Sequence, residues 1–326
     1  MIAPPSLEKL AALAPSLAPG GVGIASLRQL SGGASQELWS VVVQTPTGEA
    51  ATVLRRAPSE RGRSELAIPI ELEAALMSAA RKAGAPSPHV LYVLQPGDDL
   101  GAGFFMEHVS GEALGHKIVR DAAFAGVRPM LARQCGEILA RIHTLERPDQ
   151  LPHKPIAEII DALDRQYQME DWPRPVFELA MRWLRTNAPP DAAPTVVHGD
   201  FRNGNLLIGA EGVRAVLDWE LAHAGDPMED LGWICVNSWR FGAIDKPVGG
   251  FGSRQDLFAG YEAASGVAVD PARVHFWEVL GTLRWGVICT MSGVALREGV
   301  ATGLERAMIA RRTSETELDL LDLLEV

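Results

Sequence analysis

The first third of the chain alternates apolar and polar residues in the way β-strands do. Residues 23–56 contain GIASLRQL, ELWSVVVQ and AATVLRR, separated by a Gly- and Ser-containing break and by the turn TPTG. The segments HVLYVLQ and GFFMEHV continue this alternation further along the chain. Residues 68–84 instead carry apolar side chains at helical spacing and end in a glycine. The pattern therefore predicts a small lobe of about five strands and one helix over residues 1–109.

Beyond residue 110 the apolar positions recur with the helical period over long stretches. This holds for MLARQCGEILARIHTLE, PVFELAMRWLRTNA, SRQDLFAGYEAASG and ARVHFWEVLGTLRWGVICTM. The exception is NLLIG, AEG and VRAVLDWE, where two short apolar runs flank a turn and predict a β-hairpin. We therefore expect an α+β protein whose second lobe, residues 110–326, is larger and mostly helical.

The composition is that of a packed enzyme, with 326 residues, 47% of them hydrophobic and 22% charged. A formal net charge of −11 argues against a nucleic-acid partner, because phosphate binding needs clustered Lys and Arg. The apolar stretch VLGTLRWGVICTMSGVAL is interrupted by Arg284 and glycines, so we expect a buried core helix and no membrane span. Three isolated cysteines, and an N-terminus without a basic segment before an apolar run, favour a cytoplasmic location. The sequence gives no indication of oligomeric state.

The polar loop in VVHGDFRNGNLLI contains the candidate chemistry. Asp200 and Asn205 lie five residues apart on it, and Asp218 ends the second strand of the predicted hairpin. Two hard oxygen ligands suit Mg²⁺ on a nucleotide, because that ion fills its other positions with phosphate oxygens and water. A third carboxylate can orient an attacking hydroxyl and accept its proton. We therefore assign Asp200 as catalytic base and Asn205 and Asp218 as metal ligands. The plain alternative is a polar turn before a hairpin.

HGDFRNGN together with LDWE resembles the catalytic loop and metal-binding element of the aminoglycoside phosphotransferase and choline kinase family, distant relatives of protein kinases. Within that family the chain most resembles proteins related to the kinase-like domain of some acyl-CoA dehydrogenase family members. The resemblance covers residues 27–285. It implies a protein-kinase-like, two-lobed fold, and transfer of the γ-phosphoryl group of ATP, with GTP as the alternative, to a small-molecule hydroxyl with Mg²⁺. The acceptor stays open between an aminoglycoside, a hydroxyacyl thioester and another metabolite.

The same resemblance implies phosphate-binding residues in the small lobe. The loop LSGGASQELW occupies the place of the phosphate-covering loop, where Gly33 and Ser35 would offer backbone N–H groups. In TVLRR, Arg55 rather than Arg56 is expected at phosphate, because two-residue periodicity puts it on the same face as Val53. Arg56 is then expected in solvent.

The helix and the hinge complete the nucleotide site that the resemblance implies. Glu73 is the expected carboxylate partner of the strand arginine, with Glu71 as the alternative. In FFMEHVSG the backbone of Glu107 and Val109 would meet the adenine edge, and Met106 would line the back of the pocket.

Several neighbouring residues are expected to support the loop and not to react. His198 should fix the loop by hydrogen bonding, and His143 should be structural, whereas His223 stays ambiguous. Asp226 and Asp230 should cap helices and brace the loop.

Three aromatic residues could line an acceptor pocket, but side chains with this spacing are more often core, so they are not assigned to the site. They are Trp233, Trp239 and Phe241.

Two other functions compete with a kinase. A nucleotide-binding or interaction module without turnover is favoured only by Arg in place of the strand Lys of protein kinases. A transferase on an unrelated fold would not bind ATP at all.

Overall fold

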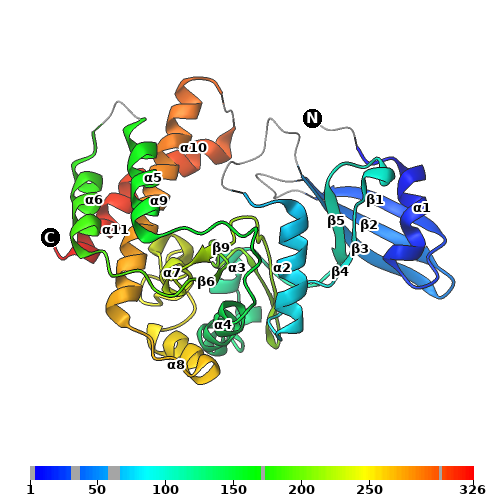
Figure 1. The fold of residues 1–326 in the computed structure, drawn as a ribbon, viewed down its shortest axis with the longest axis horizontal. Coiled ribbons are helices and arrows are strands. Elements are labelled where there is room, and N and C mark those ends of the chain that lie inside the picture. The colour runs from blue at the N-terminus through cyan, green and yellow to red at the C-terminus, as the bar shows by residue number, and fades with distance from the viewer. Residues whose placement is uncertain (1–3, 31–36, 58–66, 170–172, 301–302) are drawn as a thin grey trace.

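The computed structural model describes residues 4–30, 37–57, 67–169, 173–300 and 303–326. Figure 1 shows a small lobe, in blue and cyan, built on one β-sheet, and beside it a larger helical lobe that contains the C-terminus. This is the two-lobed α+β arrangement that the hydrophobic pattern predicts.

The small lobe is an antiparallel sheet of five strands in the order β1-β2-β3-β5-β4. Its strands are β1 (Gly23–Leu30), β2 (Glu37–Thr45), β3 (Gly48–Arg56), β4 (Val90–Val93) and β5 (Gly103–Glu107). Successive side chains of β3 point to opposite faces of the sheet, so Val53 and Leu54 belong to different hydrophobic clusters. All five strands were expected from the sequence.

One helix covers each face of this sheet: α1 (Leu7–Leu17) lies on one face and α2 (Ile70–Lys82) on the other. The sequence-based prediction of a single helix in this lobe is wrong. The segment before the first strand is rich in proline, and Pro15 lies inside α1, which disguises the helix in the sequence. Leu10, Leu13 and Leu17 nevertheless share one face and pack with Trp39 and its neighbours in a common cluster. Burial of this apolar stripe outweighs the unfavourable proline.

The large lobe is mainly helical. Its longer helices are α3 (Gly115–Arg120), α4 (Arg128–His143), α5 (Ile156–Gln168), α6 (Pro175–Asn187), α7 (Met228–Trp233), α8 (Arg254–Ser265), α9 (Pro271–Arg297), α10 (Leu304–Ala310) and α11 (Thr313–Leu324). Short 3₁₀ helices lie at Pro96–Asp98 in the small lobe and at Ala122–Phe124 and Asn237–Arg240 in the large one. The caps follow from the sequence: Ser253 accepts a hydrogen bond at the start of α8, and Asp270 does so before α9.

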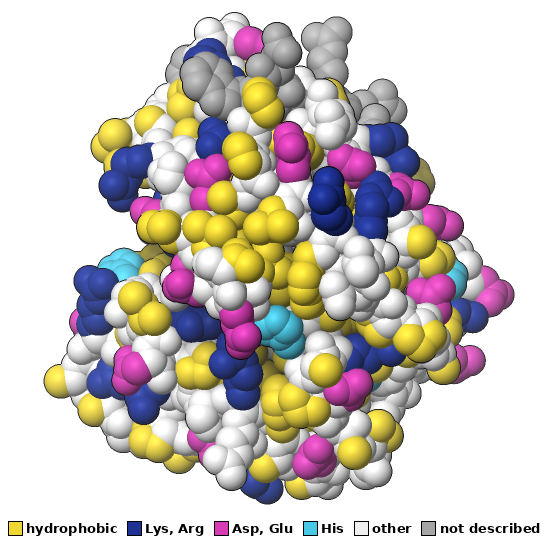
Figure 2. All heavy atoms as spheres, turned by 90° about the vertical axis from the view of Figure 1, so that its left-hand side faces the viewer, with side chains coloured by type: hydrophobic (Ala, Val, Ile, Leu, Met, Phe, Trp, Pro, Cys, Tyr) yellow, Lys and Arg dark blue, Asp and Glu magenta, His cyan; other side chains and the backbone are white. Residues whose placement is uncertain are grey.

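Helix α9 forms the centre of the large lobe and packs against α6, α7, α10 and α11. By length and apolar composition it is the one helix in the described residues that could span a membrane, and more than half of its apolar window is buried inside the protein. Such burial fits the predicted core helix. Figure 2, which shows the end of the molecule that carries the large lobe, has basic and acidic side chains interspersed around a band of hydrophobic ones.

Two small antiparallel pairs of strands lie in the large lobe, next to the small lobe. Strand β6 (Thr195–Val197) pairs with β9 (His223–Gly225), and β7 (Leu206–Gly209) forms the predicted hairpin with β8 (Gly212–Val216). Hydrogen bonds then tie these segments to the small lobe, from the N–H of Val216 to the carbonyl of Pro86 and from the N–H of Ile68 to the carbonyl of Glu220. The loops after β6 and β8 therefore lie where the lobes meet. The lobe boundary at residues 109–110 stays a prediction.

Candidate active site

The loop after β6 bends sharply at Gly199, which has φ +78°. A Cβ atom at this position would lie 2.5 Å from the carbonyl oxygen of Leu221. Both the left-handed backbone and the close approach require glycine. The glycine between His198 and Asp200 thus has a steric cause.

His198 fixes this loop, as predicted. Its Nδ1 accepts a hydrogen bond from the N–H of Asp200 at 3.2 Å, and its Nε2 lies 3.1 Å from the carbonyl oxygen of Leu217, to which it donates. Complete burial lowers the pKa of His198. The ring is therefore a neutral structural link between the loop and the end of the hairpin.

Asp230 braces the same loop from α7. Its carboxylate accepts hydrogen bonds from the N–H groups of His198 at 2.8 Å and of Gly199 at 3.0 Å, and it lies 3.2 Å from His143 Nε2. Burial opposes ionisation here, but these hydrogen bonds hold the pKa of Asp230 below its usual range. Asp226 caps the start of α7 by accepting from the N–H of Met228. The bracing and capping roles predicted for the two aspartates, and the structural role of His143, are confirmed.

Three side chains hold the carboxylate of Asp200. Its Oδ1 accepts from Trp233 Nε1 at 2.8 Å and from Arg202 Nε at 3.1 Å, and its Oδ2 accepts from Asn205 Nδ2 at 2.6 Å. Asn205 Nδ2 also donates to the backbone carbonyl of Asp200 at 2.9 Å. With its amide nitrogen committed in this way, Asn205 keeps Oδ1 as the atom that can ligate a cation.

Arg55 lies at the centre of an ion cluster that joins the lobes. Its Nε is 2.8 Å from Glu73 Oε1 on α2, and one Nη donates to Asp218 Oδ1 at 2.7 Å. Glu220 approaches the same guanidinium at 3.7 Å. The structure thus pairs Arg55 with Glu73, while the alternative Glu71 is exposed.

The expectation that Arg56 is solvated is wrong. Its side chain is buried and forms an ion pair with Glu37 at 2.6 Å, and it donates to the carbonyl of Leu100. Two-residue alternation does separate it from Arg55, as predicted, but it places Arg56 on the face shared with Leu54. Helix α1 and the segment around Leu100 cover that face, and the sequence pattern gave no sign of this cover.

The Arg55 guanidinium faces the carboxylates of Glu73 and Asp218 at close range, with Glu220 farther away. Burial, opposed by Arg55 and reinforced by the neighbouring carboxylates, raises the pKa of Glu73 to about 7. Glu73 Oε1 is engaged by the Arg55 ion pair, whereas Oε2 is buried without a hydrogen-bond partner in the part of the chain that the structure describes. Asp218 adopts φ +65°, a backbone conformation that is unfavourable for a residue with a side chain. A cation added beside these carboxylates would be attracted to them.

The oxygen donors present fit Mg²⁺ rather than a metal held by protein ligands alone. Among the described residues, no group of three or more His, Cys, Asp or Glu side chains could hold a metal ion. Magnesium typically takes one or two carboxylates and completes its shell with substrate phosphates and water. Asn205 Oδ1 and the Asp218 carboxylate offer such a partial shell.

The predicted adenine-binding residues lie along β5 and the segment after it. Met106 is buried and is paired in register with Val53 of β3. The Glu107 side chain accepts from Arg81 and from the N–H of His89, which fixes the end of the strand. Neither the N–H nor the carbonyl of Val109 makes a hydrogen bond within the described residues, so both are available to a ligand. Gly33 and Ser35 lie outside the described residues.

The sequence did not assign a site role to Trp233, Arg202 or Glu220. Trp233 is core, as its type suggests, because it packs with Trp239 and Trp285, but its indole N–H also reaches Asp200. Arg202 was visible in the loop motif, and its guanidinium lies 4.7 Å from the ring centre of Trp239. The contacts of Trp233 with Asp200 and of Arg202 with Trp239 join residues that are more than thirty positions apart, so no local pattern could have indicated them.

Comparison with known proteins identifies the family. The sequence matches the model of the phosphotransferase enzyme family over residues 26–267. It is 30% identical over 203 residues to acyl-CoA dehydrogenase family member 10 of Mus musculus, a match that covers 56% of this chain and 18% of that protein. This chain therefore corresponds to less than a fifth of that relative's length. The predicted resemblance to both groups is confirmed.

Solved structures confirm the protein-kinase-like, two-lobed fold. A Ralstonia eutropha protein assigned as an aminoglycoside phosphotransferase superposes with a TM-score of 0.77 at 22% identity, covering 98% of both chains. A spectinomycin phosphotransferase solved with ADP and spectinomycin gives a TM-score of 0.63 at 12% identity, covering 99% of this chain and 100% of that one. At these identities the likeness concerns the fold, and the acceptor must be argued from the residues of this chain.

Proposed function

Because the chain belongs to the phosphotransferase enzyme family, we propose that it transfers the γ-phosphoryl group of ATP to a hydroxyl of a small molecule. Asp200 is the catalytic base, and Asn205 and Asp218 are the Mg²⁺ ligands. The neighbour solved with ADP and spectinomycin supports an adenine nucleotide and a small-molecule acceptor. GTP is the alternative nucleotide.

The observation that carries this proposal is the fixed Asp200 carboxylate. Among the described residues two donors occupy Oδ1, whereas Oδ2 has only Asn205 as a donor, so Oδ2 keeps a lone pair for the acceptor hydroxyl. That hydroxyl donates to Oδ2, and its oxygen forms the new bond to the γ-phosphorus as the bond from that phosphorus to the β,γ-bridging oxygen breaks. The proton passes to Asp200 and then to solvent, and ADP leaves. Holding the base in one orientation is the chief contribution that a protein makes to this reaction.

The carboxylates of Glu73 and Asp218 beside Arg55 support the metal assignment. When bound, Mg²⁺ would neutralise phosphate charge, and Asn205 and Asp218 would hold it. In the proposed reaction Arg55 binds phosphate oxygens of the nucleotide, while Glu73 on α2 holds the guanidinium in place. Since Arg55 now donates to Asp218, nucleotide binding requires that this one hydrogen bond be exchanged.

The remaining nucleotide contacts belong to the small lobe. We assign adenine to the surface formed by Met106 and the backbone of Glu107 and Val109, and phosphate to the backbone of Gly33 and Ser35. The unbonded N–H and carbonyl of Val109 support the first assignment.

The test is ADP formation from Mg·ATP in the presence of pooled hydroxyl compounds, including aminoglycosides and hydroxyacyl thioesters. Asp200→Asn should lower acceptor-dependent turnover by roughly 10²- to 10⁴-fold and leave ATP binding nearly unchanged. Asp218→Ala should weaken binding of the magnesium nucleotide itself. Asp149→Asn makes the same chemical change at an exposed position and serves as the control. Full turnover by Asp200→Asn would refute the assignment of the base.

A nucleotide-binding module without turnover is the second candidate. The observation that favours it is the hydrogen bond between Arg55 and Asp218, which engages one proposed ligand in the free protein. Binding of Mg·ATP with no transfer to any pool would support this module, and acceptor-dependent ADP formation would exclude it.

A further inference from the structure

A separate cavity of about 290 Å³ lies in the large lobe between α5, α9 and the start of α7. Its apolar walls include Leu163 and Leu280. Two basic side chains also line it, Lys154 from the segment before α5 and Arg284 from α9. An apolar cavity with a few convergent charges is the usual form of a small-molecule site.

The two cations of this cavity are incompletely partnered. Within the described residues the Lys154 ammonium makes no hydrogen bond or ion pair. In the same part of the chain the Arg284 guanidinium has one ion pair, a distant one, 3.8 Å from Glu229 Oε1. The other oxygen of Glu229 is 3.0 Å from His223 Nε2, and His223 Nδ1 is 3.0 Å from the carbonyl of Leu221. The Glu229 carboxylate therefore interacts with Arg284, His223 and Lys154 at once, and the cavity carries excess positive charge.

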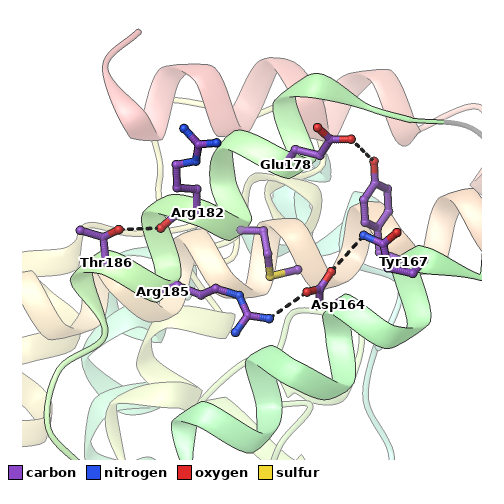
Figure 3. A pocket seen from close by; sticks show the side chains of 8 residues that line it. Asp164, Tyr167, Glu178, Arg182, Arg185 and Thr186 are labelled. Carbon is purple, nitrogen blue, oxygen red and sulfur yellow. Dashed lines mark hydrogen bonds and ion pairs between the residues drawn. The ribbon is translucent and has the colours of Figure 1, made fainter.

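Burial and the nearby Arg284 charge lower the pKa of Lys154, against the pull of Glu229. Holding two cations together in a partly buried place is unfavourable unless an anion accompanies them. Of the two arginines that line another cavity, between α5 and α6, Arg185 is arranged differently (Figure 3). There Arg185 is paired at 2.8 Å with both Asp161 and Asp164, so it has no comparable need of a ligand.

Contacts connect the cationic cavity with the proposed catalytic base. The Arg284 guanidinium lies over the ring of Trp233, 5.0 Å from its centre. The indole N–H of the same Trp233 donates to Asp200 Oδ1 at 2.8 Å. One indole ring thus lies between Arg284 of the cavity and the catalytic carboxylate.

We propose that Lys154 and Arg284 bind a carboxylate of the phosphoryl acceptor, whose short apolar body lies against Leu163 and Leu280 while its hydroxyl reaches Asp200. The planar fork of Arg284 suits a carboxylate. This inference rests on the proposed phosphotransferase function. It names an acidic hydroxy compound as the acceptor class, in contrast to a polycationic aminoglycoside, which the two basic groups would repel.

The experiment measures binding and turnover separately. The probes are the ω-hydroxy acids from 3-hydroxypropanoate to 6-hydroxyhexanoate and the neutral diols of equal length, titrated calorimetrically into the protein without nucleotide. At least one acid should bind roughly ten-fold or more tightly than its diol, since a charge-assisted hydrogen bond is stronger than one between neutral groups. Lys154→Gln and Arg284→Gln should each remove most of this preference, and Arg284→Lys should retain part of it. Arg185→Gln is the matched control and should bind like the wild-type protein.

The outcomes separate this inference from the function on which it rests. Acids that bind through Lys154 and Arg284 but are not phosphorylated would support the anion site and count against the phosphotransferase. Phosphorylation of a neutral or cationic acceptor, with no acid bound, would support the phosphotransferase and overturn the anion site. Equal binding of acids and diols, no binding of any acid, or preference for glycerol 3-phosphate over every acid would also overturn it.

Discussion

The indole of Trp233 offers a direct test of how the Asp200 carboxylate is held. Trp233→Phe removes the N–H that donates to Oδ1 at 2.8 Å and keeps an aromatic ring in the cluster with Trp239. A hydrogen bond to a charged acceptor contributes about 1.5–3 kcal/mol. Oδ1 keeps Arg202 as a donor, so we take the lower end of this range. A loss of about 1.5 kcal/mol corresponds to a fall in kcat of roughly ten-fold.

The assay is steady-state turnover of Mg·ATP with the acceptor found in the pooled screen. We expect kcat to fall while KM for ATP stays nearly constant, because the indole touches the base and not the nucleotide site. Trp285→Phe is the matched control. Its indole nitrogen is buried with no hydrogen-bond partner in the described residues, so the same change removes no hydrogen bond.

Two results would refute this reasoning. If Trp233→Phe kept kcat within about two-fold of the wild-type value, the hydrogen bond would not matter for the base. If Trp285→Phe lost as much activity as Trp233→Phe, the effect would come from packing in the aromatic cluster. Circular dichroism and thermal unfolding of both variants would show whether they fold equally well.

Three further predictions concern stability. Asp230→Asn should lower the free energy of unfolding by about 2–4 kcal/mol, because an amide N–H₂ would face donors that now bind a buried carboxylate; urea unfolding measures this. Gly136→Ala should cost about 2 kcal/mol or more, since its Cβ would lie 2.0 Å from the carbonyl oxygen of Leu257 where α4 crosses α8. Without nucleotide, the contribution of Glu73 to stability should fall as pH rises from about 4.5 to about 7, because its folded-state pKa of about 7 exceeds that of the unfolded chain.

Matched measurements check these three. Gly293→Ala on α9, where the nearest atom to a new Cβ is 3.6 Å away, should raise stability by about 0.5–1 kcal/mol, and an equal effect at both glycines would contradict the packing argument. Asp230→Asn with wild-type stability would show that its hydrogen bonds are not needed. For Glu73, the difference in unfolding free energy between wild type and Glu73→Gln should shrink between pH 5 and pH 7.5, and a constant difference would argue against the raised pKa.

Local patterns determined most of the elements and the composition of the catalytic loop. Alternation predicted the five strands, helical spacing predicted α2, α4, α6, α8 and α9, and a turn between two apolar runs predicted the β7–β8 hairpin. The same two-residue period placed Arg55 on the face that meets Glu73. These features depend on residues close together in the chain, because the period of a helix or strand fixes the direction in which each side chain points.

The sequence could not show which surfaces would be covered or which distant groups would meet. Arg56 is buried against Glu37 and the segment at Leu100, on a face of the sheet that appeared open, and α1 forms on that face despite Pro15 because its leucines gain burial there. Trp233 meets Asp200 only because α7 docks under the loop. The single charge in an apolar segment, Arg284, was visible in the sequence, but its convergence with Lys154 on one cavity was not. Such contacts join segments far apart in the chain, and only packing of the whole lobe decides them.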